Sequence, residues 1–152
     1  MVQISAGVLA YRRRPEGPQF LLAHPGGPFW AGKDDAAWSI PKGLVEAGEA
    51  HWAAAAREFA EEMGRPIAGD PEALTPVRAS GKTIVAWLVE ADFDPDGLVS
   101  NRFEIEWPPR SGRRQSFPEV DRAAWFDPQT ALRKVHKGQR PILEEAIAFL
   151  SL

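Results

Sequence analysis

Apolar runs and alternating apolar and polar positions predict a series of short strands along this chain. The first two, residues 3–11 and 19–24, flank a stretch with Pro and Gly at turn positions, so we expect a hairpin there. Residues 25–37 are interrupted by Gly and Pro and predict a long loop. Further strands are expected at residues 38–40, 74–79, 83–90, 103–107 and 123–126, with a turn at residues 80–81.

A helical period replaces the strand pattern in three places. One helix ends at Gly64, which is followed by Pro66, and two more are expected at residues 128–135 and 139–150. The apolar positions of the first helix form one stripe, made of Trp52, Ala56, Phe59 and Met63. Strands and helices mixed in this order predict an α/β fold, with a sheet covered by helices on both faces.

Three carboxylates share another face of the first helix. At about 100° per residue, Glu58, Glu61 and Glu62 fall within a sector of roughly 100°. Like charges at this spacing repel each other, and no lysine lies between them. A solvated acidic face is the ordinary explanation, whereas a hard divalent cation such as Mg²⁺ or Mn²⁺ would compensate the repulsion. Such a cation polarises a phosphoryl oxygen and activates water.

Composition narrows the choice of function. A chain of 152 residues with 44% apolar residues fits one globular domain, residues 1–152. The net charge of −3 gives no general attraction to a nucleic acid polymer or an anionic membrane. The absence of cysteine excludes disulfides and thiolate metal sites. There is no apolar run of membrane-spanning length and no signal-peptide pattern, so we expect a cytoplasmic protein.

The acidic helix belongs to a longer pattern with fixed spacing. Its members are Gly43, Glu49, Arg57, Glu58, Glu61, Glu62 and Gly64. This segment, from Gly43 to Arg65, resembles the Nudix box, G-x5-E-x7-R-E-U-x-E-E-x-G-U, in which U is a bulky aliphatic residue. Phe59 stands at the first U, and Arg65 departs from the pattern at the last. We expect Ile67 to fill the apolar position that Arg65 leaves.

The resemblance implies a fold and a set of roles. The fold is the Nudix-type α/β/α sandwich with a mixed central sheet. Glu58 and Glu62 would be the main metal ligands, and Glu61 a further ligand or the base that activates water. The carbonyl of Lys42 would add a metal ligand. Four residues would be structural: Gly43, Glu49, Arg57 and Gly64, with an ion pair between the two charged ones.

Several residues outside the box are candidates for the remaining chemistry. The Lys42 side chain would either meet a substrate phosphate or lie in solvent. Glu104, Glu106 and Glu119 are candidates for a general base. Alternation puts Glu104 and Glu106 on one strand face, which would either reach the metal or be solvated. Arg110, Arg113 and Arg114, in a basic loop at residues 108–114, would either clamp phosphates or remain free in solvent. A nucleobase would stack on Trp30, Trp38 or Trp107, although core packing is the commoner use of tryptophan.

These observations favour a Mg²⁺-dependent (or Mn²⁺-dependent) hydrolase that cleaves a phosphoanhydride bond in a nucleoside diphosphate derivative. The W-x-x-P-K-G run at residues 38–43 resembles the segment before the box in Nudix enzymes that cleave dinucleoside polyphosphates. The expected substrate is therefore a dinucleoside polyphosphate or a nucleoside triphosphate, bound as a small molecule by a monomer or homodimer. The alternatives are a hydrolase of damaged nucleotides and a non-catalytic nucleotide-binding module.

Overall fold

The computed structural model describes residues 3–79 and 81–151, and it contains a seven-stranded mixed sheet. The central strand β1 (Gln3–Arg14) pairs antiparallel with β2 (Gly17–Pro25) and parallel with β6 (Lys82–Glu90). Strand β9 (Val120–Phe126) extends the sheet beyond β2. Three short strands complete it: β3 (Lys42–Leu44) on β1, and β4 (Glu72–Ala73) and β5 (Val77–Ala79) on β6.

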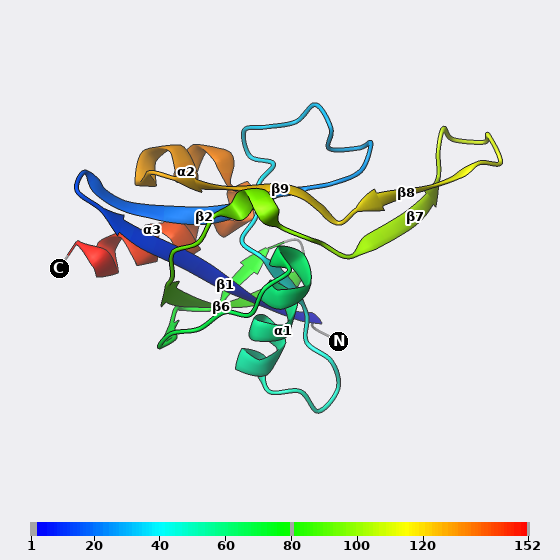
Figure 1. Ribbon diagram of the computed structural model, residues 1–152. Helices are drawn as coiled ribbons and strands as arrows, with labels where there is room; N and C mark the ends of the chain where they lie inside the picture. Colours follow the sequence, from blue (N-terminus) through cyan, green and yellow to red (C-terminus); the bar gives the residue numbers. More distant parts are fainter. Residues whose placement is uncertain (1–2, 80, 152) are drawn as a thin grey trace.

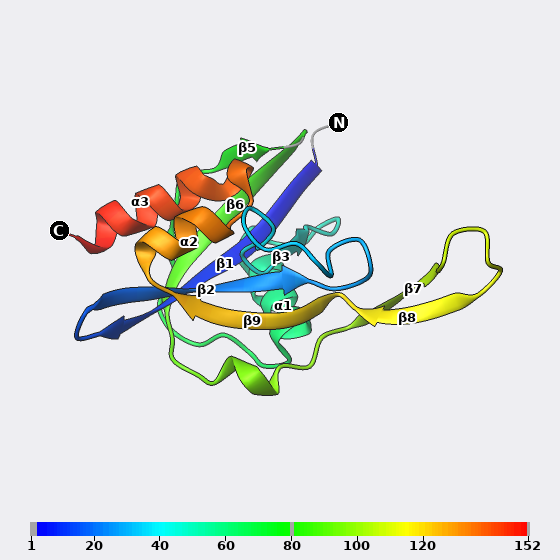
Figure 2. The same ribbon diagram turned by 90° about the horizontal axis from the view of Figure 1, so that it is seen from above.

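Helices cover both faces of this sheet (Figures 1 and 2). Helix α1 (His51–Met63) packs on one face, and α2 (Pro128–Lys134) and α3 (Arg140–Leu150) pack on the other. Each interface has its own apolar core, because successive side chains of β1 point alternately to the two faces. The predicted α/β/α sandwich with a mixed central sheet is confirmed. Within the described part of the chain, no helix has the length and apolar character needed to cross a membrane.

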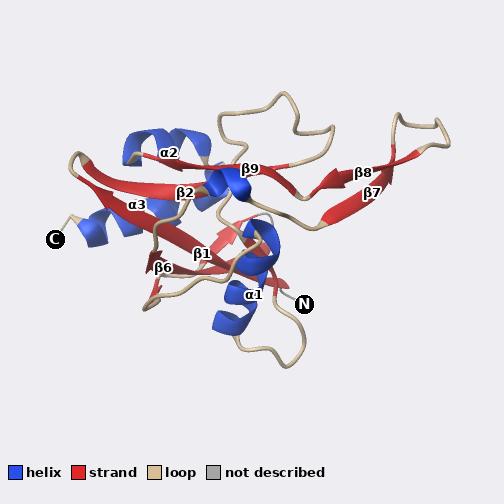
Figure 3. Cartoon of the chain, in the orientation of Figure 1, coloured by secondary structure: helices blue, strands red, loops and turns tan. Residues whose placement is uncertain are grey.

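A two-stranded ribbon projects from the sandwich (Figure 3). It consists of β7 (Arg102–Glu106) and β8 (Arg114–Pro118), paired antiparallel. The sequence predicted the first strand but treated residues 108–114 as a free loop and missed β8. The strand begins with the polar run Arg114–Ser116, which is exposed and shows no apolar alternation.

Other boundaries also differ from the prediction. The strand expected at residues 38–40 makes only isolated bridges, and regular pairing with β1 begins at Lys42. Of the strand expected at residues 74–79, only residues 77–79 form one, as β5, because Pro76 lies directly before it and cannot donate to a ladder; β4 lies before the expected range. Helix α3 begins at Arg140 rather than residue 139, after a short 3₁₀ turn, Lys137–Gln139. The turn expected at residues 80–81 includes Ser80, which lies outside the described residues.

Candidate active site

Arg57, in the middle of α1, ties the helix to the loop before it. Its guanidinium donates to both carboxylate oxygens of Glu49, at 2.8 and 3.0 Å, and to the carbonyl of Leu44 at 3.2 Å. The pair with Arg57 lowers the pKa of Glu49 to about 2. Arg57 also donates to Glu58 Oε1 at 2.8 Å and lies 3.4 Å from Glu61. The predicted ion pair between Arg57 and Glu49 is therefore present, and it holds the loop against the helix.

Gly43 lies directly against the carboxylate of Glu58. A Cβ added to Gly43 would lie 2.1 Å from Glu58 Cδ, much closer than atoms can pack. Position 43 therefore requires glycine because the Glu58 side chain lies so close to it, and not because of an unusual backbone angle. This contact, together with Arg57, fixes where the first acidic side chain of α1 lies.

Glu62 is the most electrostatically strained carboxyl of the helix. Burial is the largest cause and the neighbouring Glu58 the second, and together they raise the pKa of Glu62 to about 8. Lys42 acts in the opposite direction through its charge and a backbone hydrogen bond. Burial also raises the pKa of Glu58. Both groups would therefore gain from a bound cation, since a positive charge favours their ionised forms.

The end of α1 explains the one departure from the box pattern. Gly64 closes the helix in the left-handed conformation, with φ of 71°, and donates to the carbonyl of Ala60. Arg65 turns outward and stacks over the ring of Phe93, 4.5 Å from its centroid. Ile67 packs against the core beneath α1, as predicted. A cation–π contact thus replaces the usual apolar residue at position 65.

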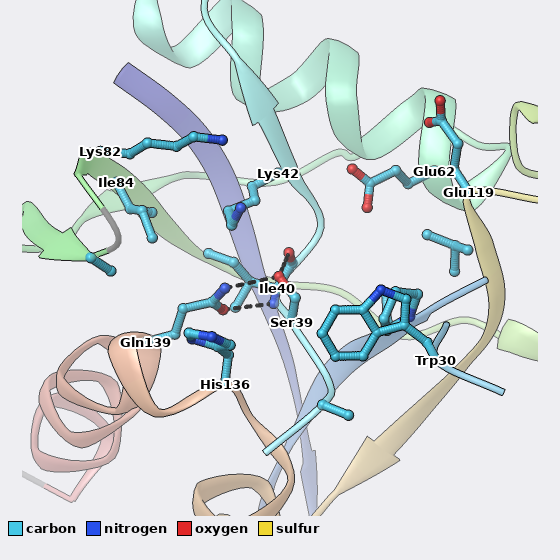
Figure 4. A pocket seen from close by; sticks show the side chains of 15 residues that line it. Trp30, Ser39, Ile40, Lys42, Glu62, Lys82, Ile84, Glu119, His136 and Gln139 are labelled. Carbon is cyan, nitrogen blue, oxygen red and sulfur yellow. Dashed lines mark hydrogen bonds between the residues drawn. The ribbon is translucent and has the colours of Figure 1, made fainter. Parts of the chain in front are cut away.

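Glu119 is the later acidic residue that the fold brings to the helix. It lies between β8 and β9, and Figure 4 shows its side chain beside that of Glu62. Two backbone hydrogen bonds fix its position: its carbonyl accepts from Gly26 at 2.9 Å, and its amide donates to Asn101 at 2.8 Å. Its charge contributes to the raised pKa of both Glu58 and Glu62.

The oxygen donors of this site suit a hard divalent cation. Among residues 3–79 and 81–151 no ready-made cluster of three acidic, histidine or cysteine ligands is present. The fit depends instead on two neighbouring carboxylates with raised pKa, Glu58 and Glu62, and on the nearby Glu119. Carboxylate oxygens are the ligands that Mg²⁺ and Mn²⁺ prefer, so the donor chemistry agrees with the predicted ion.

A pocket of about 350 Å³ opens beside these carboxylates. Figure 4 shows its floor, where the buried side chain of Gln139 accepts from the Ile40 amide at 3.0 Å and donates to Ser39 Oγ at 2.9 Å. Trp30 forms part of its wall, as one of the three tryptophans considered for stacking. Three other residues of the pocket were not predicted: Gln139, His136 and Lys82. They come from the α3 region and from the start of β6, far from the box in sequence, and carry no motif.

The structure does not bring the remaining candidates to the pocket. Glu104 pairs with Arg114 across the ribbon at 3.4 Å. Glu106 accepts from the backbone amides of Arg110 and Gly112, both at 3.1 Å, and so holds the tip of the ribbon. Arg110, Arg113 and Arg114 are exposed on the same ribbon. Trp38 is buried in the core beneath α2 and α3, and Trp107 packs edge-on against Phe29.

Comparisons with known proteins agree with the geometry. A family model described as the NUDIX domain matches residues 1–146. Among solved structures, a C. elegans Ap4A hydrolase is 25% identical with a TM-score of 0.64, over 99% of this chain and 98% of that one. The NUDIX domain of Shewanella oneidensis NrtR, complexed with ADP ribose, is 15% identical with a TM-score of 0.65, over 99% of this chain and 89% of that one.

A third structure, MutT studied from Aliivibrio salmonicida and Vibrio cholerae, is 19% identical with a TM-score of 0.59, over 96% of each chain. Similarity at the level of NrtR and MutT supports the fold alone. A search of curated proteins gives no match.

Proposed function

Because this chain belongs to the NUDIX family and is a Nudix hydrolase, we propose that it uses Mg²⁺ or Mn²⁺ to cleave a phosphoanhydride bond in a nucleoside diphosphate derivative. The observation that carries this proposal is the half-buried Glu62, which is subject to the charge of Glu58 and lines a pocket beside Glu119. Carboxylate oxygens are the ligands that such a cation prefers.

Each residue has a distinct part in this proposal. Glu58 and Glu62 would hold the cation, and Arg57 and Gly43 position Glu58 for it. When bound, the cation would neutralise phosphate charge and favour the attack of water. Glu119, or Glu61 next to Arg57, would accept the proton of that water. The water oxygen bonds to phosphorus, the bridging P–O bond breaks, and the leaving phosphate keeps the electron pair.

Dinucleoside polyphosphates and nucleoside triphosphates are the substrates we favour. The pocket provides a tryptophan, Trp30, for stacking a base, and a lysine, Lys42, for a phosphate. The C. elegans enzyme of similar fold, at 25% identity, is named as a hydrolase of Ap4A, which supports the first class. A module that only binds nucleotides would have no need to keep the mutually repelling Glu58 and Glu62.

The test is a panel of nucleotides incubated with the protein, with Mg²⁺, with Mn²⁺ or with EDTA, and product analysis by anion-exchange chromatography. We expect metal-dependent cleavage between phosphates, and a loss of turnover of at least 100-fold in Glu58→Gln and Glu62→Gln. Glu46→Gln, on the exposed loop before α1, is the matched control and should keep full activity. Ligand-induced stabilisation of the protein without cleavage of any nucleotide would refute hydrolysis and favour the binding module.

A further inference from the structure

His24, near the end of β2, is fully buried, and both of its ring nitrogens face oxygen acceptors. Nε2 lies 2.7 Å from the carbonyl oxygen of Lys33, and Nδ1 lies 2.9 Å from Asp121 Oδ1. A carbonyl oxygen can only accept, so Nε2 must carry a proton. A second proton must lie between Nδ1 and Asp121, because two unprotonated atoms at this distance would repel each other. The ring therefore joins two segments of the chain that are far apart in sequence.

The Lys33 carbonyl belongs to the loop at residues 26–37, which brings Trp30 to the pocket. Figure 4 shows the Trp30 ring among the side chains that line this pocket. The Lys33 amide donates to the carbonyl of Trp30 at 3.0 Å, and Lys33 Nζ lies 5.1 Å from the centroid of the Trp30 ring. The backbone and the ring of Trp30 are therefore both tied to Lys33, and Lys33 is tied to His24.

Side-chain burial contributes little to holding the middle of this loop. Phe29 is 62% exposed, and residues 31–35 are exposed as well. The ends of the loop have their own anchors, since the Gly26 amide donates to the Glu119 carbonyl at 2.9 Å and Asp34 accepts from Trp38 Nε1 at 2.8 Å. Between these ends, the hydrogen bond from His24 is a contact with the fully buried interior.

We propose that His24 is a positioning residue that holds Trp30, through the Lys33 carbonyl, as the surface on which the nucleobase of the substrate stacks. This inference depends on the proposed hydrolytic function. His24 acts on the affinity for the base and not on the attack at phosphorus, because Glu119 is fixed by backbone hydrogen bonds of its own segment. A histidine suits this position because one rigid ring donates in two directions, whereas an amide side chain of similar size reaches one of the two acceptors.

The first experiment compares two conservative variants of the full-length protein. The amide nitrogen of glutamine can replace Nε2, and that of asparagine can replace Nδ1, so His24→Gln keeps the donor to Lys33 and His24→Asn loses it. We expect His24→Asn to raise KM for a nucleoside triphosphate about 10-fold, the size of a base-stacking contact, and to change kcat by less than about threefold. His24→Gln should stay within about threefold of the wild type in both constants. His51→Gln, at an exposed histidine that begins α1, is the control and should leave both unchanged.

A double-mutant cycle shows whether the effect passes through Trp30. In a Trp30→Ala background, His24→Asn should raise KM by less than about twofold more, because the stacking surface is already absent. Inorganic pyrophosphate has no base, so its inhibition constant should be the same in the wild type and in His24→Asn. A full further rise of KM in Trp30→Ala, or an equal rise of the inhibition constant for pyrophosphate, would show that His24 supports the pocket as a whole and would overturn the inference.

The indole signals in a ¹H–¹⁵N correlation spectrum separate this inference from the hydrolytic proposal. Comparison with Trp30→Phe identifies the signal of Trp30, which should shift or broaden in His24→Asn and stay in place in His24→Gln. The signals of Trp52 and Trp87, which pack against each other on the α1 side of the sheet, should be unchanged in both variants if the fold is intact. A shifted Trp30 signal in His24→Gln overturns the inference, whether or not His24→Asn folds.

The two proposals therefore fail in different ways. If the Trp30 signal moves as expected but no nucleotide is hydrolysed, the role of His24 stands and the proposed function fails. If nucleotides are hydrolysed but the Trp30 signal and KM are the same in His24→Asn as in the wild type, the proposed function stands and the role of His24 fails.

Discussion

Replacing Glu62 by Gln should stabilise the metal-free protein while abolishing its activity. The folded protein holds a proton on Glu62 up to a pKa of about 8, whereas the unfolded chain releases it near 4.5. The folded state therefore binds more protons between these two values, and its free energy of unfolding falls as the pH rises through this window. Glutamine has nearly the same shape as glutamate and cannot ionise. The variant should therefore not lose this part of its unfolding free energy as the pH rises.

The magnitude follows from the size of that pKa difference. One pKa unit corresponds to roughly 1.4 kcal/mol, so a fully buried Glu62 would destabilise the fold by about 5 kcal/mol above pH 8. The side chain is only partly shielded from water, and solvent screening reduces our expectation to about 2 kcal/mol. For a chain of this length, the melting temperature of the variant should rise by roughly 4–8 °C.

The assay is urea denaturation with EDTA at pH 9 and at pH 5. We expect the full gain in unfolding free energy at pH 9. At pH 5 we expect less than about 1 kcal/mol, because this pH lies only slightly above the pKa of the unfolded chain and little of the loss has yet accumulated. Glu61→Gln is the matched control on the same helix. Its carboxylate is paired with Arg57, so its removal should give no gain.

Addition of Mg²⁺ should make the wild type more stable than Glu62→Gln. The wild type should gain about 2.7 kcal/mol at a 100-fold excess over the dissociation constant, and Glu62→Gln should gain much less. Equal stability of the two proteins at pH 9 in EDTA, or a gain that is the same at pH 5, would show that Glu62 is not strained as described.

Three further predictions test the surroundings of the site. Gly43→Ala should force the Glu58 carboxylate to move, lowering stability by about 1–3 kcal/mol and activity at least 10-fold, as measured by thermal unfolding and product release. Glu119→Gln should reduce turnover by at least 10-fold, and Glu106→Gln, which affects only the ribbon tip, by less than threefold; the reverse order would place the base on the ribbon. Activity at low Mg²⁺ should rise with pH as Glu62 loses its proton, and higher Mg²⁺ should move this rise to lower pH, because proton and cation compete for one carboxylate.

The sequence predicted the acidic helix well because the information there is local. Helical spacing alone places Glu58 and Glu62 on one face and Phe59 and Met63 on the buried one, and the structure buries both apolar side chains. The ion pair between Arg57 and Glu49 was likewise predictable, since a loop that enters a helix brings the two residues together.

The rest of the site depends on tertiary structure that spacing does not reveal. Lys82 reaches the pocket because β6 lies parallel to β1, and Gln139 because a 3₁₀ turn precedes α3. A single lysine or glutamine on such an element carries no periodic signal. For Glu104 and Glu106 the sequence did predict the strand and its alternation. It did not predict that this strand pairs with β8 in a projecting ribbon, away from the pocket.

The hydrogen bonds of Gln139 to Ser39 and Ile40 make the C-terminal part of the chain a component of the pocket. A fragment that stopped before residue 139 would keep the whole Gly43–Arg65 signature and would still be recognised by a motif scan. It would nevertheless expose the Ile40 amide and lose the base of its substrate cavity. In truncated or fused gene products of this type, an intact signature is therefore poor evidence of a working enzyme.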